Sequence, residues 1–134
     1  MGKSQRVKGA AGEREAAKAL NETIGGEWRR GFAQTRRGGK EEPDIVSDNY
    51  PEVHVEVKRG KRNLNLWGAL KQAKDDTEDS HLLPIVMARR DQEKWVVMFE
   101  LHDLLELADI LHTTVRLDVS PRKTAPKRKL PPRR

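Results

Sequence analysis

The stretch that decides the fold is Pro43-Asp44-Ile45-Val46-Ser47-Asp48-Asn49-Tyr50-Pro51-Glu52-Val53-His54-Val55-Glu56-Val57-Lys58. Two strand-like runs, Asp44 to Asp48 and Glu52 to Lys58, flank Asn49-Tyr50-Pro51, where the Asn and the Pro favour a turn. The stretch therefore predicts a β-hairpin.

The second predicted strand has one apolar and one polar face, because successive side chains of a strand point to opposite sides. The apolar face holds Val53, Val55 and Val57, and the polar face holds His54, Glu56 and Lys58. Residues two apart on a strand are roughly 6.5 Å apart, so the Glu56 carboxylate and the Lys58 ammonium can converge on one ion and its water. Asp44 can bring a second carboxylate to the same point. We interpret His54 as a bystander on this face.

Composition limits the architecture and the class of protein. The chain has 134 residues, 35% of them hydrophobic, which allows one domain with a modest core. No apolar run approaches the roughly 20 residues that span a bilayer, and no apolar signal segment follows Met1 to Lys8. We expect a soluble, cytoplasmic protein without a membrane partner. The absence of cysteine excludes disulfides and thiolate metal sites.

The net charge of +6 is concentrated at the C-terminus. Residues 121–134 hold seven of the 27 basic residues and no acidic one, so the rest of the chain is close to neutral. A proline-rich basic segment with almost no apolar content does not offset its ordering entropy, and we expect residues 120–134 to be a disordered tail. The tail either holds nucleic-acid phosphates loosely or serves as a solvated end.

A helical pattern from about Ala10 to Ile24 follows a basic, glycine-containing arm, which we expect to be flexible over residues 1–9. Glu13 lies on the apolar face of this helix, within about 60° of Ala16, Ala17, Leu20 and Ile24. A buried carboxylate needs a partner, so Glu13 should meet a metal, a lysine or the edge of a polar cleft. The alternative is an exposed glutamate in a frayed first turn.

The remaining elements alternate between strands and helices. We expect strands at Glu27–Thr35, Leu83–Ala88 and Trp95–Phe99, the last two covered on both sides, and a short strand at Thr113–Val119. Helices are expected at about Leu66–Asp79, with Gln72 on the border of the buried stripe, and at about His102–Leu111, with Leu104, Leu105, Ala108 and Leu111 on one face. This order predicts an α/β domain over residues 1–119, a central mixed sheet flanked by helices. It also brings Glu13, Asp44, Glu56 and Lys58 within reach of one cleft.

Two parts of the chain resemble known nucleases. Asp44 after Pro43, followed by Glu56-Val57-Lys58 on the next strand, resembles the PD-(D/E)xK motif of the restriction-endonuclease-like nucleases. Lys8-Gly9-Ala10-Ala11-Gly12-Glu13-Arg14-Glu15 is similar to the opening of the archaeal-type Holliday junction resolvases. Arg36 before a Gly-containing loop agrees with that group, whereas Gly38-Gly39-Lys40 stands where those resolvases usually carry a serine.

The residue types and the resemblance together imply a metal-dependent endodeoxyribonuclease. Carboxylates without His or Cys partners favour a hard cation, so Mg²⁺, with Mn²⁺ as a substitute, is expected at Asp44 and Glu56, with the Val57 carbonyl and Glu13 on the outer side. Lys58 would orient and help to deprotonate the attacking water, or offset charge on phosphorus. The resemblance implies products with 5′-phosphate and 3′-hydroxyl ends.

The resemblance also implies a substrate and an assembly. A four-way junction has two-fold symmetry and needs paired nicks, so a resolvase should be a homodimer. Its contact is expected among Trp67, Leu64, Phe99, Leu101 and Leu107; the alternative is that these residues are ordinary core. Residues expected to grip junction phosphates are Lys3, Arg6, Lys8, Arg36, Arg37, Lys40, Arg59, Lys61 and Arg62.

Three functions compete at this point. The first is a junction-resolving enzyme acting in recombination and repair. The second is another endonuclease of the same superfamily, such as a flap, nicking or restriction-type enzyme. The third is a non-catalytic DNA-binding module, against which the full set Glu13, Asp44, Glu56 and Lys58 argues. A small cysteine-free nuclease suits a bacteriophage, acting in the host cytoplasm, or an archaeon.

Overall fold

The computed structural model describes residues 3–31 and 42–117 of the chain. Its elements are α1 (Lys3–Thr23), β1 (Arg29–Arg30), β2 (Ile45–Val46), β3 (Val53–Gly60), α2 (Leu66–Asp76), β4 (Leu83–Arg90), β5 (Val96–Met98), the 3-10 helix η1 (Leu101–Asp103) and α3 (Leu104–Leu117). The basic loop at 36–40 and the predicted tail at 120–134 lie outside the described residues. Within the described ranges, no helix is long and apolar enough to cross a membrane.

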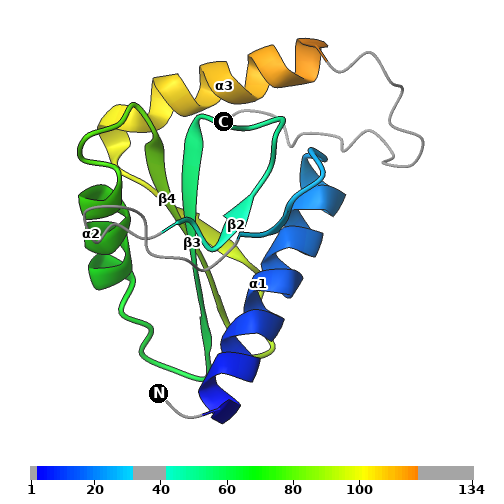
Figure 1. Cartoon of the computed structure of the whole chain (residues 1–134), viewed down its shortest axis with the longest axis vertical. Coiled ribbons are helices and arrows are strands. Elements are labelled where there is room, and N and C mark those ends of the chain that lie inside the picture. The colour runs from blue at the N-terminus through cyan, green and yellow to red at the C-terminus, as the bar shows by residue number, and fades with distance from the viewer. Residues whose placement is uncertain (1–2, 32–41, 118–134) are drawn as a thin grey trace, which may run out of the picture.

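The strands of the described segments form one mixed sheet in the order β1-β2-β3-β4-β5 (Figure 1). β3 and β4 run parallel, from Val53 opposite Leu83 to Gly60 opposite Arg90. A parallel pair needs a long crossover, and α2 lies in this connection. The other neighbouring strands pair antiparallel. The α/β domain with a mixed sheet and flanking helices, expected from the sequence, is confirmed.

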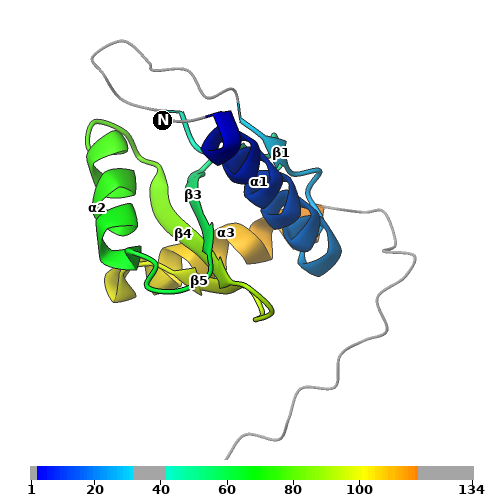
Figure 2. The ribbon, with the colours of Figure 1, turned by 90° about the horizontal axis from the view of Figure 1, so that it is seen from below.

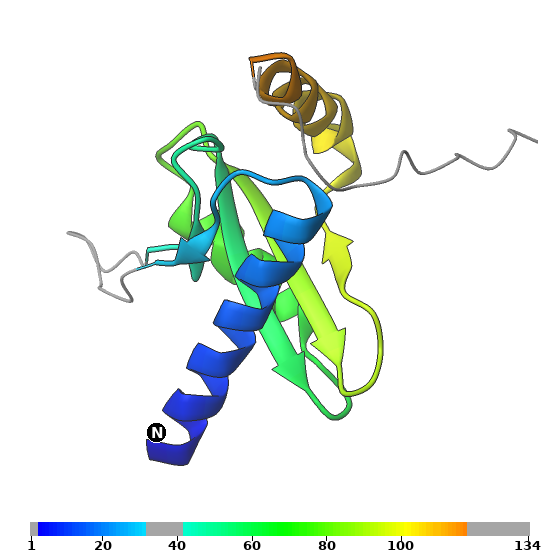
Figure 3. The ribbon, with the colours of Figure 1, turned by 90° about the vertical axis from the view of Figure 1, so that its right-hand side faces the viewer.

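Helices cover both faces of the sheet, with β3 and β4 between α1 and α2 (Figure 2). The core on the first face joins Val55 and Ile85 to Ala16 of α1, with Leu107 and Ile110 of α3 packed against it. The core on the second face joins Val86 and Ala88 to Ala69 and Leu70 of α2. Figure 3 shows α3 across one end of the sheet, away from the N-terminal end of α1.

The predicted hairpin is present, with β2 antiparallel to β3 and Ile45 opposite Val55. Its alternation is confirmed as well, because Val53 and Val55 join the core on the α1 side while His54 and Glu56 are buried on the other. β1 lies tightly against the start of the hairpin. A Cβ added to Gly31 would come within 2.2 Å of the Pro43 carbonyl oxygen, so this close approach requires glycine.

The flexible arm predicted for residues 1–9 is wrong from Lys3 onward, because α1 already begins there. Lys, Gln, Arg and Ala are good helix formers, and their propensities outweigh the single glycine, Gly9, that interrupts residues 3–11. The second glycine, Gly12, is buried where α1 approaches β3. A Cβ at this position would lie 3.0 Å from the Arg59 Cβ, so Gly12 lets the helix pack closely.

The C-terminal part of the domain differs from the prediction in three ways. β5 is an edge strand rather than a doubly covered one, with Val96 53% and Val97 50% exposed. α3 continues to Leu117, so the strand predicted at 113–119 is wrong over its first five residues. Finally, α3 packs through Leu107, Ile110 and Leu111, whereas Leu104 and Leu105 of the predicted buried face are 47% and 83% exposed.

Candidate active site

Asp44 lies where β1, β2 and β3 meet, and three hydrogen bonds fix it there. Its backbone N–H donates to the Val55 carbonyl at 3.0 Å, and its own carbonyl accepts from the Gly31 N–H at 2.9 Å. The Val57 N–H donates to the Asp44 carboxylate, Oδ2, at 2.7 Å. The Asp44 carboxylate thus accepts a hydrogen bond from a strand N–H that would otherwise need a backbone acceptor. This bond ties the Asp44 side chain to β3.

Glu56 shares the site with Asp44. In the hairpin register, which pairs Ile45 with Val55, Asp44 and Glu56 come next to each other across the strands. Burial, followed by the negative charge of Glu56, raises the pKa of Asp44 from its ordinary 3.8 to about 7, and a hydrogen bond with Glu56 adds to the rise. The Val57 N–H and the Lys58 ammonium lower this pKa in part. Asp44, Glu56 and Lys58 therefore act on one another, as the sequence predicts.

Glu13 approaches the same point from α1. Its Oε2 accepts a hydrogen bond from Arg30 Nε at 2.7 Å, in an ion pair whose glutamate side chain is only 16% exposed. Burial raises the pKa of Glu13 and the Asp44 charge raises it further, while the Arg30 hydrogen bond opposes both. The partner that the buried Glu13 requires is thus Arg30 of β1. Glu13 is also close enough to Asp44 for the two charges to interact.

Lys58 occupies the outer end of this site. It lies two residues beyond Glu56 on β3, on the same face of the strand, and its side chain is exposed. Its charge lowers the pKa of Asp44, so the ammonium is near enough to influence the carboxylates while remaining open to a substrate. All four predicted active-site residues are therefore gathered at one edge of the β2–β3 hairpin and α1.

A second group of polar residues lies beneath Glu56, and the sequence interpretation missed it. His54, interpreted as a bystander, is fully buried, and its Nε2 lies 2.9 Å from Glu56 Oε1. Asp76 of α2 is also buried, with Oδ2 3.9 Å from the same nitrogen. Gln72 donates from Nε2 to both carboxylate oxygens of Asp76, at 3.2 and 3.1 Å. The signal available in the sequence was Asp76 three residues after Ala73, on the buried stripe of the helix.

The site fits a hard divalent cation. Two carboxylates held against each other, one with its pKa raised to about 7, form an arrangement whose repulsion a cation relieves. Oxygen donors suit Mg²⁺ or Mn²⁺. Ligand atoms of His54, Glu56 and Asp76 also lie within 4.8 Å of one another, which makes a second, more deeply buried candidate group around Glu56.

The predicted DNA-binding residues fall into three sets. Lys61 and Arg62 are exposed in the turn after β3. Arg59 is only 28% exposed at its side chain and forms ion pairs with Glu15 and Asp91, so its expected role in gripping phosphate is a poor match to its contacts. The structure describes no side-chain positions for the third set, Lys3, Arg6, Lys8, Arg36, Arg37 and Lys40.

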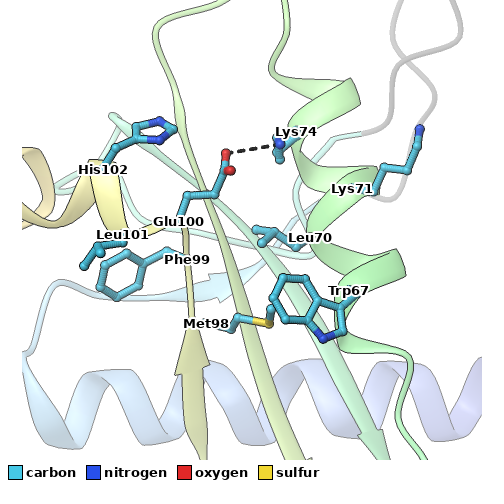
Figure 4. Close-up of a pocket in the computed structure, with 9 residues that line it drawn as sticks. All are labelled: Trp67, Leu70, Lys71, Lys74, Met98, Phe99, Glu100, Leu101 and His102. Atoms are coloured by element: carbon cyan, nitrogen blue, oxygen red, sulfur yellow. Dashed lines mark ion pairs between the residues drawn. The ribbon is translucent and has the colours of Figure 1, made fainter.

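A groove separate from this site lies between α2 and the β5–η1 segment (Figure 4). It has a volume of about 530 Å³, and an ion pair of 3.2 Å between Lys74 and Glu100 bridges it. Trp67, beside Met98, and Leu101 lie on its rim and are 78% and 82% exposed. Asp44, Glu56 and Lys58 do not line the groove.

One comparison with known proteins gives a match. The model of a family described as "Phage putative PDDEXK endonuclease" matches residues 4–129. Neither the curated proteins nor the solved structures include a match. The matched range contains the whole hairpin and all four residues gathered at its edge.

Proposed function

Because this chain belongs to the phage PDDEXK endonuclease family, we propose that it is a divalent-metal-dependent endonuclease that resolves four-way (Holliday) DNA junctions. Family membership makes it a nuclease that acts on nucleic acid. The observation that supports the metal-dependent chemistry is the pair Asp44–Glu56, held across the hairpin with Lys58 beside it.

Each residue of the proposed centre has a separate role. Asp44 and Glu56 hold the cation, with the Val57 carbonyl and Glu13 on the outer side. Mg²⁺, or Mn²⁺ in its place, supplies an activated water and neutralises charge on the leaving oxygen when bound. Lys58 orients the water and offsets negative charge that develops on the phosphate. Hydrolysis leaves a 5′-phosphate and a 3′-hydroxyl.

The choice of a four-way junction rests on the similarity of Lys8 to Glu15 to the opening of the junction resolvases. Phosphate contacts would come from the exposed Lys61 and Arg62, from basic residues of α1 and from the loop at 36–40. Such contacts read the shape of branched DNA rather than its base sequence. As a member of a phage family, the enzyme would act on DNA in the host cytoplasm during recombination and repair.

A panel of substrates tests the proposal. Purified protein is incubated with Mg²⁺ and equal amounts of labelled four-way junction, flap, linear duplex and single strand, with Glu56→Ala alongside. We expect paired nicks near the branch point, absent in EDTA and in the variant, because Glu56 supplies a carboxylate to the cation. Cleavage without preference for the junction would instead favour a flap, nicking or restriction-type enzyme. Tight junction binding without cleavage in Mg²⁺ or Mn²⁺ would leave a DNA-binding module.

Paired nicking requires two centres, and the groove rim offers a contact for a homodimer. Trp67 and Leu101 expose large apolar side chains on the same groove, as expected of a surface covered by a second copy. Replacing both by serine should shift the protein from dimer to monomer in sedimentation equilibrium, while single-strand nicks persist. A wild-type protein that is already monomeric at the concentration where it makes paired nicks would contradict this contact.

A further inference from the structure

The interface between β3 and α2 has an unusual composition, which points to a role for its polar residues. α2 packs on the sheet through Ala69, Leu70 and Ala73, but one turn further on its buried residue is Asp76, which approaches His54. His54 is 0%, Glu56 7% and Asp76 4% exposed. Buried polar side chains lower stability unless their hydrogen bonds are satisfied, so the buried His54, Glu56 and Asp76 need partners, and together with the exposed Gln72, which donates to Asp76, they form a polar seam.

We propose that His54 and Asp76 are positioning residues, which hold the Glu56 carboxylate in the orientation that binds the catalytic cation. This inference rests on the proposed function and extends it from the residues that meet the cation to those beneath them. Glu56 is held at two sides: Oε1 lies 2.9 Å from His54 Nε2, and the carboxylate shares a hydrogen bond with Asp44. Its rotation is therefore restricted before a cation arrives.

The chemistry of the pair defines the tautomer of His54. An ionised carboxylate only accepts hydrogen bonds, so Nε2 must carry the proton and donate it to Glu56 Oε1. Asp76 favours the same tautomer, because its Oδ2, 3.9 Å from Nε2, would repel the lone pair that the other tautomer places there. The two amide contacts from Gln72 keep the Asp76 carboxylate facing the imidazole.

Donation from a buried imidazole has two effects on a ligating carboxylate. It fixes the oxygen that accepts the hydrogen bond, and it leaves the other oxygen to face Asp44. Partners of this kind change metal affinity about 10- to 100-fold in other metalloproteins. The alternative is that His54 Nε2 is itself a ligand, since ligand atoms of His54, Glu56 and Asp76 lie within 4.8 Å of one another.

Four variants of the full chain distinguish these roles, with Mn²⁺ affinity measured by titration calorimetry in the absence of DNA. His54→Leu fills the site but cannot donate, and we expect Mn²⁺ binding about 10- to 100-fold weaker. His54→Gln keeps an N–H donor near the position of Nε2 and should restore affinity to within about 3-fold of wild type. Asp76→Asn, which loses the negative charge beside His54, should bind Mn²⁺ with an affinity between those of His54→Leu and His54→Gln. The exposed His81 supplies the matched control, His81→Leu, with unchanged affinity.

Thermal unfolding without metal completes the test. A merely structural histidine would lower the melting temperature in His54→Leu and leave the Mn²⁺ affinity of the folded protein unchanged; that outcome would overturn the inference. Failure of a folded His54→Gln to recover affinity would make His54 a ligand instead. If His54→Leu does not fold, the Mn²⁺ affinities of His54→Gln and Asp76→Asn still distinguish a positioning role of His54 from a merely structural one. A wild-type protein that neither binds Mn²⁺ nor cuts DNA would refute the proposed function itself, a result distinguishable from failure of the seam.

Discussion

Asp44→Asn is expected to make the metal-free protein more stable above pH 7, by up to about 4 kcal/mol, while abolishing DNA cleavage. Folding raises the pKa of Asp44 from 3.8 to about 7, and each tenfold gain in proton affinity corresponds to about 1.4 kcal/mol. The folded state thus binds the proton more tightly than the unfolded state, and the free energy of unfolding falls as pH rises from about 4 to 7. Asparagine carries no charge that burial disfavours or that Glu56 repels, and its side-chain oxygen can still accept a hydrogen bond from the Val57 N–H.

Urea unfolding in EDTA at pH 5 and pH 8 measures the free energy of unfolding of both proteins. The gain in Asp44→Asn over the wild type should be small at pH 5 and reach its full value at pH 8. Adding Mg²⁺ at pH 8 should stabilise the wild-type protein and leave Asp44→Asn unchanged, since the cation needs the carboxylate. Asp48→Asn is the matched control in the same hairpin, because Asp48 is 90% exposed at its side chain and pairs with Arg29 only at the surface. An Asp44→Asn protein less stable than wild type at pH 8 would show that burial and the charge of Glu56 do not penalise the ionised Asp44 as described.

Lys58→Met is expected to lower the rate of the cleavage step by about 10³-fold, within the range of 10²- to 10⁴-fold typical of lost proton-transfer groups. Methionine keeps much of the aliphatic stem but removes the ammonium that orients the water and offsets charge on the phosphate. The ammonium also lowers the pKa of Asp44, so its loss should weaken metal binding at neutral pH. Raising the pH should recover metal binding but not the rate, which separates the two effects.

Single-turnover cleavage with saturating DNA and Mg²⁺ gives the rate, and Mn²⁺ titration gives the affinity. Lys18→Met serves as the control, because Lys18 is an exposed lysine on α1 outside the proposed centre. A Lys58→Met protein that cuts at the wild-type rate would remove Lys58 from the chemistry and leave only the groups proposed to hold the cation.

The hairpin and its polar face could be predicted from the sequence because the information is local. Val53, Val55 and Val57 alternate with His54, Glu56 and Lys58, and a period of two allows only one assignment of faces. Glu13 was placed correctly on the buried side of α1 for a similar reason, since alanines at 16 and 17 and leucine at 20 mark that side. Its partner Arg30 was not predictable, because the pair joins segments 17 residues apart in the chain.

The errors arose where the local pattern is ambiguous. Leucine, isoleucine or alanine occupies so many positions of α3 that two overlapping faces are equally apolar, and only packing against the core on the α1 side of the sheet selects Leu107, Ile110 and Leu111. Asp76 was overlooked because a lone aspartate in a run of charged residues is typical of a solvated helix face. The spacing from Ala73 places Asp76 on the buried side of α2, but its contact with His54 depends on the packing of α2 on β3, which joins residues 22 apart in the chain.

The polar seam between β3 and α2 has a consequence for the energy landscape of the protein. Most of this small domain is minimally frustrated, with local propensity, alternation and burial in agreement, whereas the seam and the Asp44–Glu56 pair place costly groups together. Among the described residues, these groups lie on β3, on α2 and at the start of β2, and they are separate from the core shared by α1 and α3. Substitutions in the core shared by α1 and α3 can therefore change stability with little effect on the seam, whereas the face of the sheet beneath α2 carries both the seam and a second core.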